Sequence, residues 1–130
     1  MASKVSERPF IRTARDAADL CEARFRGCTG EKLLVLHLDA DRRLLRIVEE
    51  QGGPAHVDIP VHAIVADAVR INSVGLILAH CHPSGDTSPS EADVAATRRL
   101  GALAAGLGIA LHDHLVFGRG CSSFRALGLL

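Results

Sequence analysis

The chain has 130 residues and a mass of 13.8 kDa, which is enough for one hydrophobic core and too little for two. It is 48% hydrophobic and 23% charged, a composition that excludes a mainly disordered protein. Fifteen basic residues balance fifteen acidic ones and four Phe are the only aromatic rings, so neither a generally basic nucleic-acid surface nor an aromatic stacking platform is expected, although a local basic patch is not excluded.

The first half of the chain predicts one helix and one hairpin. Residues 1–10 carry charges without apolar periodicity, whereas residues 11–27 space their apolar side chains as a helix does. Segments 32–39 and 44–49 are strand-like and predict a β-hairpin. The sequence Gly52-Gly53-Pro54 then ends the second strand.

The second half alternates helices and strands. Residues 60–72 predict a helix, and residues 74–79 form a short apolar run that is typical of a strand buried on both faces. A second helix over 88–107 and a strand over 109–117 follow. This alternation predicts an α/β domain of three layers, in which a mixed sheet is flanked by helices.

The helix over 88–107 is expected to begin at a capping box, with Ser88 as the N-cap and Glu91 as its acidic partner. Ser90 and Asp93 then lie in the first turns, three residues apart, and share one face of the helix. The loop before the helix is rich in proline and glycine, so it can fold back toward the preceding strand. Asp93 can therefore come close to the end of that strand.

His80 and His82 directly follow the apolar strand. In an extended chain residues two apart project to the same side, so both imidazoles can reach one ion while Cys81 faces the other way. With Asp93 they leave one tetrahedral position open, as in a catalytic zinc site. On residue types alone other interpretations remain, because a His-x-His pair is often a surface or core feature and Ser90 and Asp93 are ordinary residues at a helix start.

The spacing of these residues matches a known signature. His-x-His-x(7)-Ser-x(2)-Asp is the motif of the JAMM (JAB/MPN) metalloprotease superfamily, and the wider sequence resembles the RadC family within it. The segments that carry the resemblance are LILAHCHPSGDTSPSEAD, LGIALHDHLVFG and SSF. The resemblance implies a JAB/MPN fold, similar to that of cytidine deaminases, over residues 30–130, preceded by a tail and helix at 1–29.

The resemblance also implies a role for each site residue. His80, His82 and Asp93 would hold Zn²⁺, and Glu31, at the head of the first strand, would be the general base and proton shuttle. Ser90 would donate a hydrogen bond to the developing oxyanion or position the water. The implied activity is a zinc-dependent hydrolase that cleaves an amide or isopeptide bond in a peptide or protein conjugate. Apart from the resemblance, Glu31 is only a charged residue at a strand start.

Two other functions remain open at this stage. A RadC-like accessory factor in DNA repair or recombination would be a binding module with little or no catalysis. The neutral charge speaks against direct DNA binding, and the helix-hairpin-helix segment typical of full-length RadC proteins finds no counterpart in the roughly thirty residues before the domain. A deaminase would suit the fold, but it requires a Cys-x-x-Cys pair that this sequence lacks.

Location and redox state follow from what the sequence lacks. The sequence contains no apolar run of the length needed for a signal peptide or a membrane helix, so we expect a cytoplasmic protein that does not enter a membrane. The cysteines form no Cys-x-x-Cys pair and are expected as reduced thiols. An edge strand of the sheet offers a route to a homodimer.

Several residues near the motif have simpler interpretations. Cys81 stands where RadC relatives commonly carry Asn and is expected to be a buried thiol facing away from the metal, although a thiol near zinc can compete as a ligand. His112 and His114 form a second His-x-His pair, for which we expect a structural hydrogen bond rather than another metal site. Asp86 is expected to form a turn rather than to accept a hydrogen bond from a histidine ligand.

Overall fold

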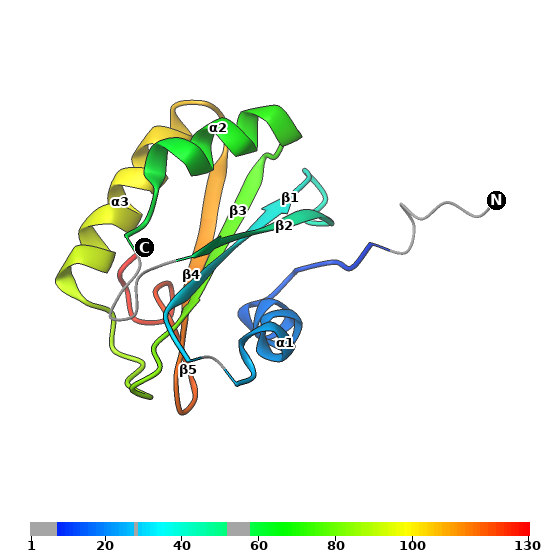
Figure 1. Cartoon of the computed structure of the whole chain (residues 1–130). Coiled ribbons are helices and arrows are strands. Elements are labelled where there is room, and N and C mark those ends of the chain that lie inside the picture. Colours follow the sequence, from blue (N-terminus) through cyan, green and yellow to red (C-terminus); the bar gives the residue numbers. More distant parts are fainter. Residues whose placement is uncertain (1–7, 28, 52–57) are drawn as a thin grey trace.

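The computed structural model describes residues 8–27, 29–51 and 58–130. The features predicted at residues 1–7, at Cys28 and at Gly52-Gly53-Pro54 lie outside the described residues. In these described ranges three helices and five strands follow one another (Figure 1). They are α1 (Ala14–Phe25), β1 (Lys32–Leu38), β2 (Leu44–Gln51), α2 (Val61–Ile71), β3 (Gly75–Cys81), α3 (Glu91–Ala105), β4 (Ala110–Phe117) and β5 (Cys121–Ser123).

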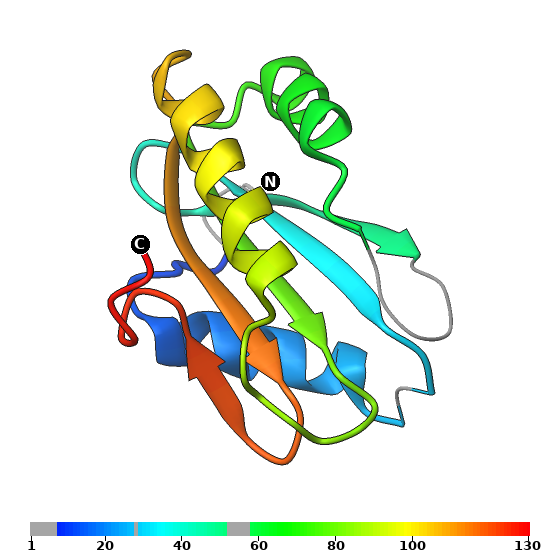
Figure 2. The same cartoon turned by 90° about the vertical axis from the view of Figure 1, so that its left-hand side faces the viewer.

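The five strands form one mixed sheet in the order β2-β1-β3-β4-β5. Strand β1 runs antiparallel to both β2 and β3, β3 and β4 are parallel, and β5 pairs antiparallel with β4. Helix α1 covers one face of the sheet, and α2 and α3 cover the other (Figures 1 and 2). The predicted three-layer α/β fold with a mixed sheet is therefore confirmed.

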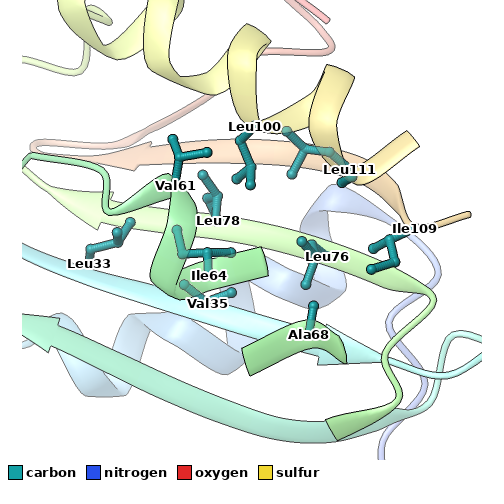
Figure 3. Close-up of a cluster of buried hydrophobic side chains, with 11 residues drawn as sticks. Leu33, Val35, Val61, Ile64, Ala68, Leu76, Leu78, Leu100, Ile109 and Leu111 are labelled. Carbon is teal, nitrogen blue, oxygen red and sulfur yellow. The ribbon is translucent and has the colours of Figure 1, made fainter. Parts of the chain in front are cut away.

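Strand β3 is the centre of two hydrophobic cores. Leu76 and Leu78 point into the core beneath α2 and α3, which also contains Leu100 (Figure 3). Ile77 and Ala79 point into the core beneath α1. Because side chains alternate along a strand, His80 belongs to the α2/α3 face and Cys81 to the α1 face. The prediction of a strand buried on both faces is confirmed.

Helix α3 buries only part of the apolar side chains in its sequence. In α3 the residues Thr97, Leu100 and Ala104 face the sheet, at spacings of three and four. Leu103 and Leu107, which continue the apolar pattern in the sequence, are 45% and 57% exposed. None of the helices in the described ranges combines the length and the apolar character needed to cross a membrane.

Candidate metal centre

The pairing of β1 with β3 brings Glu31 to the two histidines. Leu33 pairs with His80 and Lys32 with Cys81, so one further step along the antiparallel register places Glu31 opposite His82. Glu31 is 8% exposed, and its Oε1 lies 3.6 Å from His82 Nε2. One ligand atom each from Glu31, His80 and His82 lies within 4.8 Å of the other two, a group that can hold a metal ion.

Asp93 completes the group from the first turn of α3. Its Oδ2 lies 3.4 Å from His80 Nε2 and 3.8 Å from His82 Nε2, and the two Nε2 atoms are 2.8 Å apart. Burial raises the pKa of Asp93, but the hydrogen bond and charge of His80 and the Ser90 amide outweigh it, so this pKa lies well below its ordinary value. The structure thus brings together the side chains of Glu31, His80, His82 and Asp93.

The loop after β3 fixes the orientation of the His82 ring. His82 Nδ1 donates a hydrogen bond of 2.7 Å to the main-chain carbonyl of Asp86, which leaves Nε2 as the ring nitrogen that faces the centre. The Asp86 carboxylate instead accepts from the Ser88 amide and forms the expected turn. Asp86 therefore serves both purposes that the sequence offered as alternatives, one with its main chain and one with its side chain.

The ring nitrogen of His80 that faces away from the centre contacts His114. His80 Nδ1 lies 2.7 Å from His114 Nε2, and His114 Nδ1 lies 2.8 Å from Thr97 Oγ1. The His114 ring stacks on Phe124, with 4.4 Å between ring centroids. Burial, with a smaller contribution from His80, lowers the pKa of His114 well below its ordinary value, so this ring is neutral. The structural hydrogen bond expected of His114 is confirmed.

Thr97 is a residue of this chain of contacts that the sequence analysis did not identify. It lies four residues after Asp93 and therefore on the same face of α3. A polar residue on a face that packs against the sheet was the available signal.

His112 differs from His114 in its surroundings. A bulge in the β3–β4 pairing separates the two histidines, and His112 Nδ1 accepts a hydrogen bond from Arg42. The two histidines of this pair therefore have different surroundings.

Ser90, and not Ser88, is the N-cap of α3. Ser90 Oγ accepts a hydrogen bond from the Asp93 amide, and the Ser90 amide donates to Asp93 Oδ2. The prediction of a box formed by Ser88 and Glu91 is wrong, because the Ser88 amide is already engaged by the Asp86 carboxylate in the preceding turn. The capping box therefore also orients the Asp93 carboxylate toward the histidines.

Replacing Ser90 by Ala is expected to lower the free energy of unfolding by about 1 kcal/mol, because the Asp93 amide loses its cap. Ser88→Ala is the matched control and should change stability little, since the Ser88 side chain does not cap the helix. Urea unfolding followed by circular dichroism measures both variants. Equal losses in the two would contradict this assignment of the cap.

The centre opens into a cleft of about 470 Å³. Four of the site residues line this cleft: Glu31, His82, Ser90 and Asp93. The His80 side chain is 1% exposed and lies behind the others, whereas His82 is 15% exposed and borders the cleft. A molecule in this cleft can therefore approach His82 and both carboxylates from one side.

Cys81 lies on the other face of the sheet, as predicted, and packs in the core beneath α1. Its side chain therefore does not take part in the group of possible ligands. Cys21 and Cys121 are free thiols, which confirms their predicted reduced state. Cys81 is disulfide-bonded, so the same prediction is wrong for this residue.

Two glycines hold the loop that carries His82 against the turn after β4. A Cβ atom at Gly118 would lie 2.4 Å from the carbonyl oxygen of Gly85, and the Arg119 amide donates to that same oxygen. We expect Gly118→Ala to lower the free energy of unfolding by about 1–3 kcal/mol, because main chain must move to make room. Gly120→Ala is the control, since a Cβ there meets no atom within 4 Å. Thermal and urea unfolding of the two variants test this difference.

Comparison with known proteins gives a consistent result. A family model described as "RadC-like JAB domain" matches residues 11–129. The chain is 39% identical to a "UPF0758 protein" of Rhodobacter capsulatus over 130 residues, which cover 98% of this chain and 61% of that protein. It is 34% identical to a UPF0758 protein of Ruegeria pomeroyi, with 98% of this chain and 58% of that protein covered.

The chain thus spans about three fifths of the length of these two relatives. The family match extends over α1 as well as the sheet and the two other helices. The family model matches nearly the whole chain, and the mixed sheet with helices on both faces agrees with a JAB/MPN fold. The chain therefore belongs to the RadC-like JAB domain family.

Proposed function

We propose that this domain is a zinc-dependent hydrolase that cleaves an amide or isopeptide bond in a peptide or protein conjugate. The observation that carries the proposal is the meeting of two imidazole nitrogens and two carboxylates at the wall of one cleft. In the proposed assignment His80, His82 and Asp93 hold the metal and Glu31 remains free to move protons. Asp93 suits the ligand role because its Oδ2 approaches both Nε2 atoms.

The donor set fits a catalytic zinc ion. Zinc binds neutral imidazole and carboxylate, and three protein ligands leave one position open. The carbonyl of Asp86 fixes the His82 tautomer that exposes Nε2. In the proposed tautomers His80 donates from Nδ1 to His114 Nε2, and His114 donates from Nδ1 to Thr97 Oγ1. A neutral His80 ring with its proton on Nδ1 has a lone pair on Nε2, which can bind the metal. Two such lone pairs 2.8 Å apart repel each other unless a cation or a proton lies between them. A proton on His80 Nε2 also makes the hydrogen bond to Asp93, so zinc would take the place of that proton.

The proposed mechanism divides the work among the residues around the cleft. A zinc ion, when bound, polarises a carbonyl group and lowers the pKa of water toward ~7. Glu31 takes a proton from the attacking water and returns it to the leaving amine. The Ser90 hydroxyl accepts a hydrogen bond from the Asp93 amide and keeps its own proton, which it can donate to the developing oxyanion.

Zinc content tests the proposed ligand set. We expect about one zinc ion per chain in purified protein and at least a tenfold loss of zinc affinity in Asp93→Asn. This change keeps the shape of the side chain, and the Asn oxygen can still accept the capping hydrogen bond from Ser90. Glu91→Gln removes the same charge from the same helix turn at an exposed position and should leave zinc bound. Elemental analysis and competition with a chromogenic chelator measure both; equal affinities would contradict the ligand role of Asp93.

A further inference from the structure

A second cavity lies on the α1 face of the sheet, on the opposite side from the metal centre. It has a volume of about 610 Å³ and is lined by residues at the start of α1 and after β5. These two segments lie side by side in the fold (Figure 2). Ile77, whose side chain points toward α1, lines this cavity, whereas His80 on the same strand points to the other face. The residues that matter for its chemistry are Arg12, Ala14, Arg42, His112 and Arg125.

The fold positions the three arginines of this cavity. Arg42 has a positive φ of 64° and donates from Nε to the Ile11 carbonyl, from Nη1 to His112 Nδ1 and from Nη2 to the Arg12 carbonyl. Arg125 Nε donates to the His112 carbonyl. The Arg12 guanidinium lies 4.2 Å from the centroid of the Phe10 ring. These contacts leave each guanidinium group with further N–H donors, because arginine carries five.

The positive charge of the three arginines is not neutralised by ion pairs. Within the described ranges no carboxylate forms an ion pair with Arg12, Arg42 or Arg125. Asp113 also lines the cavity, but its carboxylate already accepts hydrogen bonds from the Ser123 hydroxyl and from the main-chain amides of His114 and Arg125. Three guanidinium groups against one carboxylate leave an excess of positive charge in the lining.

The first turn of α1 adds main-chain donors to the same cavity. Ala14 is the first residue of the helix and lines the cavity, so its amide has no acceptor within the helix. The positive end of the helix dipole lies there as well. The Asp16 carboxylate is the acidic group of this turn, and it accepts from the Arg12 and Thr13 amides. The positive charge around the cavity also affects His112. Burial, followed by the charges of Arg42 and Arg125, lowers the pKa of His112, so this ring adds no further charge.

We propose that this cavity binds the phosphate group of a small molecule. Guanidinium groups pair with phosphate oxygens through two parallel hydrogen bonds, and helix N-termini bind the same group through main-chain amides. A phosphate dianion suits a lining with an excess of positive charge better than a carboxylate does, because a carboxylate brings only one negative charge. The volume is in the range of small-molecule sites, about 300–1,000 Å³. This binding is independent of the hydrolase proposed above.

Titration with inorganic phosphate at constant ionic strength tests the proposal. We expect saturable binding by isothermal titration calorimetry and about a tenfold weaker affinity in Arg125→Gln and in Arg12→Gln, since each loses charge-assisted hydrogen bonds. Arg99→Gln is the matched control: it removes one exposed arginine from α3, outside the cavity, and should bind phosphate as the unmodified protein does. Thermal unfolding shows that each variant is folded.

The position of binding is read from amide chemical shifts. Phosphate should shift the amide signals of Ala14 and Ile77. Shifts confined to residues around His82 would place the phosphate at the metal centre and overturn the proposal. Absence of saturable binding, equal weakening in all three variants, or equal affinity for acetate would overturn it too. Binding of a single-stranded oligonucleotide without binding of inorganic phosphate would likewise overturn it, because the cavity would then not be a site for a small phosphate-bearing molecule.

Discussion

Glu31→Gln is expected to keep zinc bound and to lower amide or isopeptide hydrolysis by about 10²–10⁴-fold. Glutamine has nearly the shape of glutamate, so the buried position beside His82 stays filled. It cannot accept a proton from water or return one to a leaving amine. The same substitution therefore removes the proposed proton transfer without removing any of the three proposed metal ligands.

Two measurements on the same preparation are needed, zinc content and turnover. A panel of peptides with ordinary and lysine-side-chain amide bonds provides the substrates, and Glu91→Gln serves again as the control with the same loss of charge. Full activity in Glu31→Gln would exclude Glu31 as the base. Loss of zinc would instead show that Glu31 is a ligand, a role that its distance to His82 also allows geometrically. The two outcomes therefore correct different parts of the proposal.

The apolar pattern of the sequence was sufficient to predict the buried strand β3. Leu76 and Leu78 alternate with Ile77 and Ala79 in an unbroken apolar run, which is typical of a strand covered on both faces. The close approach of His80, His82 and Asp93 was also predictable. The two histidines are two residues apart at the end of a strand, and Asp93 lies in the first turn of the next helix, after a loop that can fold back. These features depend on sequence neighbours.

The position of Glu31 depends instead on strand pairing. Nothing near Glu31 in the sequence specifies that β1 pairs with β3 so that Lys32 lies opposite Cys81. A slip of one residue would turn Glu31 to the α1 face, away from His82. Its role could therefore be expected only from the resemblance to a family, whereas the register is a property of the whole sheet.

The surroundings of His112 and His114 illustrate the same limit. In the sequence the two histidines look equivalent, since residues two apart share a face of a regular strand. The bulge in the β3–β4 pairing removes this equivalence: Leu76 pairs with Leu111 and Ile77 with Asp113. A bulge arises from contacts between two strands, and no local composition indicates it here. Similarly, both Ser88 and Ser90 suit an N-cap, and the turn at Asp86 decides between them.

His114→Phe is expected to weaken zinc binding by about 10–100-fold, although His114 is not a proposed ligand. Phenylalanine keeps a ring stacked on Phe124 but offers no acceptor to His80 Nδ1. The His80 ring then loses the contact that fixes its orientation and its tautomer. The free energy of unfolding should also fall by about 1–3 kcal/mol, because buried polar atoms of His80 and Thr97 lose their partners.

Matched variants separate this positioning role from a general loss of stability. His112→Gln changes the other histidine of β4, which contacts Arg42, and should leave zinc affinity unchanged. Thr97→Val breaks the far end of the same chain of contacts while keeping its volume. If His114 acts through this chain, the double variant of His114 and Thr97 loses less zinc affinity than the sum of the two single losses. Additive losses, or an unchanged zinc affinity in His114→Phe, would show that the metal centre itself orients the His80 ring, and that the contacts with His114 and Thr97 do not.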